Sequence, residues 1–215
     1  IPKADDAINS AKLSAIVGCL LWLALRGRPD IAWAVSRASS LVATEPDVCR
    51  WRVRQIMQYL RWTPDLSMLI KPTKPDDWHK LGVYTDASLA PQGGKSQSGF
   101  VLTLGPNIVA WGSSRQSIIA LSSCEAELIA ACSGSQLALA ILTQIREMKR
   151  VETTMDIFLD NAAVLQICAS DKVAANSRTR HLAMRAFWLK HLSENVAKLH
   201  FVETTKQRAD ALTKG

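Results

Sequence analysis

The hydrophobic pattern of the chain changes its period at one place, and this change constrains the fold more than any other feature. Apolar residues recur at helical spacing before the segment 71–77 (KPTKPDD), whereas several stretches after it alternate as strands do. The segment carries two prolines, several charges and no apolar periodicity, which is typical of a linker or an exposed loop. We therefore expect two units: a small all-α segment over residues 1–72 and an α/β domain over residues 73–215.

Three helices are expected in the first unit. The nearly uncharged run Leu13–Leu25 predicts a buried helix, and the run is too short to span a bilayer. Asp30 is expected to cap a second helix that continues to about Val42. A third helix should open at Glu45-Pro46-Asp47, because apolar residues follow at helical spacing at positions 53, 56, 57 and 60.

The second unit predicts alternating strands and helices. A glycine-containing turn at Gly105-Pro106 should join two strands into a hairpin, and Ser122 with Glu125 forms the S-x-x-E pattern of a capping box before a long helix. The expected strands are 81–86, 99–104, 107–111, 155–159 and 198–202, and the expected helices are 123–149, a short one ending at 168, 178–196 and the start of one at 208–212. This order predicts a mixed five-stranded sheet with helices packed on its faces.

Four acidic residues of the second unit occupy positions suited to a shared site. Asp86 and Asp160 each end a predicted strand, and ligands of α/β sheets bind beyond strand ends. Glu127 lies near the start of the long helix, about 200° round it from the capping Glu125. Asp210 begins the last predicted helix. If the two strands are neighbours, these carboxylates could face one crevice.

Converging carboxylates repel one another, and burial raises their pKa values, so such a cluster persists when divalent cations neutralise it. Oxygen ligands without histidine or cysteine suit Mg²⁺ or Mn²⁺ rather than zinc. Two such ions about 4 Å apart activate water and stabilise the leaving oxygen in phosphodiester hydrolysis. Each acid taken singly is also explained by an ordinary strand end or helix cap.

The charge of the chain is moderately positive, with 26 Lys and Arg against 19 Asp and Glu, a formal charge of +7. This charge fits either a polyanionic partner or ordinary solvation. Arg50, Arg54 and Arg61 lie within about 40° of one another on the third helix. Trp51 and Trp62 flank this arginine row, as suits a phosphate backbone with stacked bases. The alternative is a solvated face whose tryptophans cover another domain.

A second basic stretch runs from Lys172 to Lys190 and contains Arg178, Arg180, His181 and Arg185. We expect it to form an edge that binds nucleic acid; the alternative is an ordinary basic surface helix. Ser122 and Ser123, at the start of the long helix, could donate to phosphate or sugar oxygens. Capping alone explains Ser122 equally well.

Four stretches resemble, in order, the acidic motifs of ribonuclease H: Tyr84-Thr-Asp-Ala-Ser88, Glu127-Leu-Ile-Ala-Ala131, Leu159-Asp-Asn161 and Arg208-Ala-Asp-Ala-Leu212. Others are similar to the Pol polyprotein of copia-type (pseudoviral) LTR retrotransposons: 28–36 (RPDIAWAVS), 95–100 (KSQSGF), 111–116 (WGSSRQ), 120–128 (ALSSCEAEL), 177–181 (SRTRH) and 209–214 (ADALTK). The resemblance extends from about residue 8 to the end.

The resemblance implies a ribonuclease H-like domain preceded by the thumb or connection segment of a reverse transcriptase. It implies that Asp86, Glu127, Asp160 and Asp210 hold two Mg²⁺ or Mn²⁺ ions and cleave the RNA strand of RNA–DNA hybrids. The expected partners are the hybrid and the reverse-transcriptase core of the same polyprotein, with no membrane. The paired aspartates of a polymerase site are absent, so the chain should not synthesise DNA.

One departure from the ribonuclease H pattern affects the expected activity. Many ribonucleases H carry a histidine in the loop before the last acid, and residues 202–207 (VETTKQ) contain none. Copia-type elements share this lack, so the resemblance holds. The lack nevertheless favours an enzyme that is slow or that depends on the rest of its polyprotein. His181 could approach the site instead, or serve a structural or phosphate-contacting role.

Two other functions compete with this interpretation. A silent or repurposed remnant could keep the fold and bind nucleic acid or act as a scaffold. A transposase or integrase on the same fold would not need Glu127 together with Asp210.

The five cysteines form no CxxC pair, which favours buried reduced thiols and a cytoplasmic (virus-like particle) or nuclear rather than secreted protein. The chain starts without methionine, so we expect a piece of a longer polypeptide.

Overall fold

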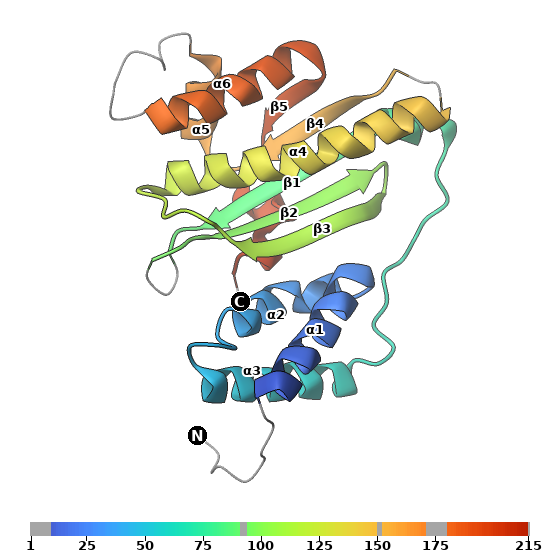
Figure 1. The fold of residues 1–215 in the computed structure, drawn as a ribbon. Helices are drawn as coiled ribbons and strands as arrows, with labels where there is room; N and C mark the ends of the chain where they lie inside the picture. Colours follow the sequence, from blue (N-terminus) through green and yellow to red (C-terminus); the bar gives the residue numbers. More distant parts are fainter. Residues whose placement is uncertain (1–9, 91–93, 150–151, 171–179, 215) are drawn as a thin grey trace.

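The computed structural model describes residues 10–90, 94–149, 152–170 and 180–214, and these form three layers (Figure 1). A mixed five-stranded sheet in the order β3-β2-β1-β4-β5 is the middle layer. Its strands are β1 (Lys80–Ser88), β2 (Gln97–Leu104), β3 (Asn107–Arg115), β4 (Thr154–Leu159) and β5 (Ala197–Phe201). One outer layer contains α4 (Ser123–Lys149), α5 (Ala162–Ala169) and α6 (Arg180–Asn195), and the other contains α1 (Ser10–Arg26), α2 (Ala32–Ser39) and α3 (Pro46–Trp62). The expected fold class is confirmed.

Two helix predictions are wrong in detail. Asp30 does not cap α2, because its carboxylate accepts hydrogen bonds from the Arg28 guanidinium, and α2 stops at Ser39 instead of Val42. The expected final helix is only a 3₁₀ turn, η6 (Asp210–Leu212). Short 3₁₀ turns of this kind are frequent at helix termini and as connectors. By contrast, α4 has the bounds that the sequence predicted.

Strand alternation sorts the sheet residues between the two helical layers. Leu81 and Val83 of β1 point toward α4 and belong to a fully buried core that also includes Leu102, Leu128 and Ile157. The α4 helix is long and apolar enough to cross a membrane by length and composition, but 56% of its apolar window is buried inside the protein. This burial arises because α4 lies across the sheet (Figure 1).

A second core joins the first three helices to the opposite face of the sheet. Val101 and Trp111 of the sheet and Leu212 of η6 pack with buried residues of α1, α2 and α3. The Trp111 indole Nε1 donates a hydrogen bond of 2.7 Å to the carbonyl of Ala24, and the Gln97 amide donates one of 2.9 Å to the Ser36 hydroxyl. The helical segment is therefore attached to β2, β3 and η6 by both apolar packing and buried hydrogen bonds. The division at residues 72 and 73 stays a prediction.

Candidate active site

Three carboxylates meet at one end of the sheet. Ligand oxygens of Asp86, Glu127 and Asp160 all lie within 4.8 Å of one another. Asp86 is near the end of β1 and Asp160 directly follows β4, and these strands are parallel neighbours, so their carboxyl ends lie at the same edge. Glu127 reaches the same point from the second turn of α4. The structure therefore brings together three of the four acids selected from the sequence.

The two glutamates at the start of α4 have different environments. The Glu125 backbone N–H donates a 3.1 Å hydrogen bond to the Ser122 hydroxyl, as expected of a cap. Its carboxylate accepts from the N–H of Leu121, at 2.7 Å, rather than from that of Ser122 as in a regular capping box. The Glu127 carboxylate accepts from the Ala87 backbone N–H beside Asp86. Glu125 therefore closes the helix end, and Glu127 faces the acidic cluster.

The fourth acid, Asp210, lies beside this group on η6. The ammonium of Lys214 pairs with the Asp210 carboxylate and also interacts electrostatically with Asp86 and Asp160. The hydroxyl of the buried Thr213 donates to Asp86. Sequence reasoning did not select Thr213 or Lys214, although both belong to the 209–214 motif. The spacing of four residues between Asp210 and Lys214 is the only local signal that could have pointed to the ion pair.

Gly99 of β2 allows η6 to approach the sheet so closely. A Cβ atom added at Gly99 would lie 2.8 Å from the Leu212 Cβ and 2.8 Å from the Thr213 Cγ2. Contacts this short force atoms to move, so a side chain at this position would displace the turn. Because Gly99 pairs with Asp86 across β1 and β2, the missing side chain is directly beside the acids.

The electrostatics of the cluster favour protonated carboxyls when no cation is bound. Burial, followed by repulsion from Asp86 and Asp160, raises the pKa of Glu127 to about 9. Burial also raises the pKa of Asp86, although the Thr213 hydroxyl and the Lys214 charge partly oppose this shift. The hydrogen bond to Asp210 raises the pKa of Lys214. Among the described residues that shift the pKa of Asp86, Lys214 is the one cation, and Asp160 and Asp210 oppose it.

The donor set fits hard divalent cations. Asp86, Glu127 and Asp160 offer only carboxylate oxygens, and two of them are almost fully buried. Mg²⁺ and Mn²⁺ prefer such oxygens, and their charge would remove the repulsion that raises the glutamate pKa.

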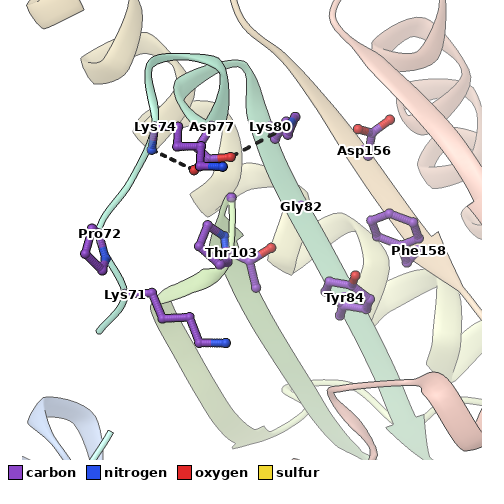
Figure 2. A pocket seen from close by; sticks show the side chains of 12 residues that line it. Lys71, Pro72, Lys74, Asp77, Lys80, Gly82, Tyr84, Thr103, Asp156 and Phe158 are labelled. Atoms are coloured by element: carbon purple, nitrogen blue, oxygen red, sulfur yellow. Dashed lines mark hydrogen bonds and ion pairs between the residues drawn. The ribbon is translucent and has the colours of Figure 1, made fainter. Parts of the chain in front are cut away.

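A pocket of about 570 Å³ opens elsewhere, on the face of the sheet that carries Gly82 and Tyr84 (Figure 2). The rings of Tyr84 and Phe158 stack at 4.5 Å there, and the His200 ring stacks on Phe158 at 5.2 Å. None of the four acids lines this pocket, so it is separate from the acidic cluster.

The predicted nucleic-acid contacts occupy three places. Ser122 and Ser123 are exposed at the start of α4, beside the acids. Arg54 and Arg61 are exposed on α3, whereas Arg50 is half-buried and pairs with Asp47. Trp51 and Trp62 of the same helix are 46% and 72% exposed.

The second basic stretch is described only in part. Arg178 lies outside the described residues, as do the side chains of Arg180 and His181, although both residues belong to α6. Arg185 is half-buried on α6, and its carbonyl accepts from the Cys132 thiol. The binding role of all these residues stays a prediction.

No family model matches the chain. The chain is 29% identical over 216 residues to the retrovirus-related Pol polyprotein from transposon TNT 1-94 of Nicotiana tabacum, a match that covers 98% of this chain. It is 30% identical over 205 residues to that from transposon RE1 of Arabidopsis thaliana, covering 93% of this chain. The chain belongs to the Pol polyproteins of copia-type retrotransposons. It spans 16% and 13% of these two relatives, so it corresponds to a small part of each.

Two further similarities differ in kind. The chain is 31% identical over 144 residues to secreted RxLR effector protein 161 of Plasmopara viticola, covering 66% of this chain and 98% of that protein. Among solved structures, ribonuclease H1 of Halobacterium salinarum aligns at 21% identity with a TM-score of 0.48, covering 62% of this chain and 93% of that one.

Proposed function

We propose that this chain hydrolyses the RNA strand of RNA–DNA hybrids, as the ribonuclease H part of a copia-type Pol polyprotein. The observation that carries this proposal is the meeting of buried Asp86 and Glu127 with Asp160 at one end of the sheet, within 4.8 Å. The order of the acids along the chain and the membership in the Pol family support it. The proposed partners are the hybrid and the reverse-transcriptase core, and the proposed location is the cytoplasm, in a virus-like particle, or the nucleus.

Asp86, Glu127, Asp160 and Asp210 would hold two Mg²⁺ or Mn²⁺ ions. When bound, such ions supply a Lewis acid for the scissile phosphate and an activated water. The residues of the chain then position the substrate and balance charge. Thr213 holds the Asp86 carboxylate in place, and Lys214 offers a positive charge beside Asp210 to the incoming phosphate.

Labelled hybrid incubated with Mg²⁺ or Mn²⁺ tests this proposal, with single-stranded RNA and duplex DNA as substrate controls. The wild-type chain should cleave only the RNA strand of the hybrid. Asp86→Asn and Asp160→Asn should abolish cleavage. Asp156→Asn is a matched control, because Asp156 lies on β4 four residues before Asp160 but pairs with His200 instead of joining the cluster. If all three variants cleave like the wild type, the activity belongs to a contaminant.

The alternative is a silent or repurposed remnant that only binds nucleic acid or acts as a scaffold. The similarity to a secreted effector protein over 98% of that protein's length favours it. The same assay separates the two functions. A remnant would bind the hybrid without cleaving it in any divalent cation, and Asp86→Asn would leave its affinity unchanged.

A further inference from the structure

A buried arginine of α2 has no counter-charge among the residues that the structure describes. Arg37 is only 5% exposed, yet within the described part of the chain its guanidinium makes no ion pair or hydrogen bond, and its Nε atom is fully buried. The Nε atom of Arg52 on α3 is also buried, with no hydrogen-bond partner in the described ranges. Arg28 shows the usual arrangement: it is 8% exposed, and its guanidinium binds both oxygens of Asp30 as well as Thr63.

Arg37 is also close to other positive charges. Burial, and then the charges of Arg52 and Arg115, lower the pKa of Arg37. These residues come from three elements that meet, because α2 packs against both α3 and β3. A buried charge without a partner is strongly unfavourable, and three arginines together increase the cost. An anion bound among them would reverse the sign of this interaction.

The arginines share an end of the sheet with the acidic cluster. Asp86, Gly99 and Ser113 are aligned across β1, β2 and β3, and Arg115 lies two residues beyond Ser113. Side chains two apart on a strand share a face, so Arg115 points to the same side as Ser113, toward the helical segment. Two strand spacings of about 4.8 Å place Ser113 about 10 Å from Asp86, and the two further residues along β3 place Arg115 about 12 Å from it.

We propose that Arg37, Arg52 and Arg115 form a site for a backbone phosphate of the nucleic acid whose scissile phosphate lies at the acids. A guanidinium carries five donors in a planar fork that matches phosphate oxygens, so three of them can surround one phosphate. Arg115 is exposed, so a phosphate in solution can reach its guanidinium, and Arg37 is the buried member of the site. Anion binding itself does not depend on the proposed function, but the assignment to a hybrid backbone rests on it.

The anion is tested first, by thermal melting of the metal-free protein in sodium phosphate and in sodium chloride at equal ionic strength. Phosphate should raise the melting temperature of the wild type above its value in chloride. Arg37→Met and Arg52→Met should lose this increment, while Arg37→Met melts at the same or a higher temperature in chloride because it removes an unpaired buried charge. Arg26→Met, at an exposed arginine of α1, is the matched control and should keep the increment.

The source of the phosphate is tested by titrating a labelled RNA–DNA hybrid in Ca²⁺. Arg37→Met should weaken binding about tenfold, the usual loss for a charged hydrogen bond. Arg115→Gln changes an exposed side chain that the core does not need, and it should lower the slope of log affinity against log salt by about one unit. Arg26→Met should change neither quantity.

Three results would overturn the proposal. The first is a wild type that melts equally in phosphate and chloride, and the second is an increment that survives in Arg37→Met and Arg52→Met. The third is a lost phosphate increment with unchanged hybrid affinity, which would assign the site to a free anion instead of a nucleic acid. Failure of hybrid cleavage alone would refute the proposed function and leave the phosphate increment in place.

Discussion

Replacing Glu127 with glutamine should flatten the dependence of the stability of the metal-free protein on pH. The folded protein holds the pKa of Glu127 at about 9, against an ordinary value of 4.5. Above pH 4.5 the unfolded chain loses this proton while the folded chain keeps it, so the raised pKa stabilises the fold only at low pH. The contribution declines as the pH rises and is lost completely once the pH passes about 9.

The size of the effect follows from the shift. Each pH unit between the two pKa values costs about 1.4 kcal/mol, so Glu127 should lower the free energy of unfolding by up to about 4 kcal/mol between pH 5 and pH 8. Glutamine has nearly the same shape and no charge, so the variant should lose this term. Asp86, whose pKa is also raised, contributes with the same sign in both proteins.

Urea unfolding in EDTA at pH 5 and pH 8 measures the effect, as the difference between the wild type and Glu127→Gln. Glu147→Gln is the matched control, because it makes the same chemical change on an exposed position of α4. Adding Mg²⁺ at pH 8 should stabilise the wild type far more than Glu127→Gln, because the cation binds the ionised cluster. Parallel stability curves for the wild type and Glu127→Gln would show that the Glu127 carboxyl titrates normally and that the cluster is not under electrostatic strain.

Four other substitutions or sets test separate parts of the structure. Glu125→Ala should cost about 0.5–2 kcal/mol of stability and leave cleavage per folded molecule unchanged, because it removes a cap. Loss of cleavage without loss of stability would show that Glu125, and not Glu127, acts in the acidic cluster. Gly99→Ala should displace η6, lowering cleavage and costing about 1–3 kcal/mol in urea unfolding; normal cleavage would contradict the tight approach of Leu212. Trp111→Phe should cost about 1–3 kcal/mol, because the Ala24 carbonyl stays buried without a donor; an unchanged midpoint would refute that hydrogen bond. Neutralising Arg50, Arg54 and Arg61 together should weaken binding of long hybrids more than short ones in Ca²⁺, and equal losses would show that α3 does not form a second contact.

The sequence predicted the fold well where a single periodic pattern decided the structure. The change from helical to strand period located the sheet, and the apolar run from Ser123 to Lys149 together with its cap located α4 with the bounds observed. The prediction failed where contacts with other side chains override local preference. Asp30 has the composition of a cap, but the buried Arg28 takes its carboxylate.

The acidic site was predictable only in part for a similar reason. The positions of Asp86 and Asp160 follow from strand ends, and the separation of Glu127 from Glu125 follows from helix geometry. The roles of Thr213 and Lys214 depend on how η6 sits on Gly99, which is a contact between residues more than 100 positions apart. The lack of a partner for Arg37 within the described structure likewise depends on how α2, α3 and β3 pack together.

The shared core around Trp111 has a consequence for inheritance. A recombination event in the linker between α3 and β1 would join a helical half from one element to a sheet half from another. The new helical half would have to place a backbone carbonyl where that of Ala24 lies, within reach of the Trp111 indole. It would also have to supply apolar partners for Leu212. Without them, η6, which carries Asp210, would lose its packing against the helical segment. The two halves should therefore descend together, and family trees computed separately from residues 10–62 and 80–214 should have the same branching order.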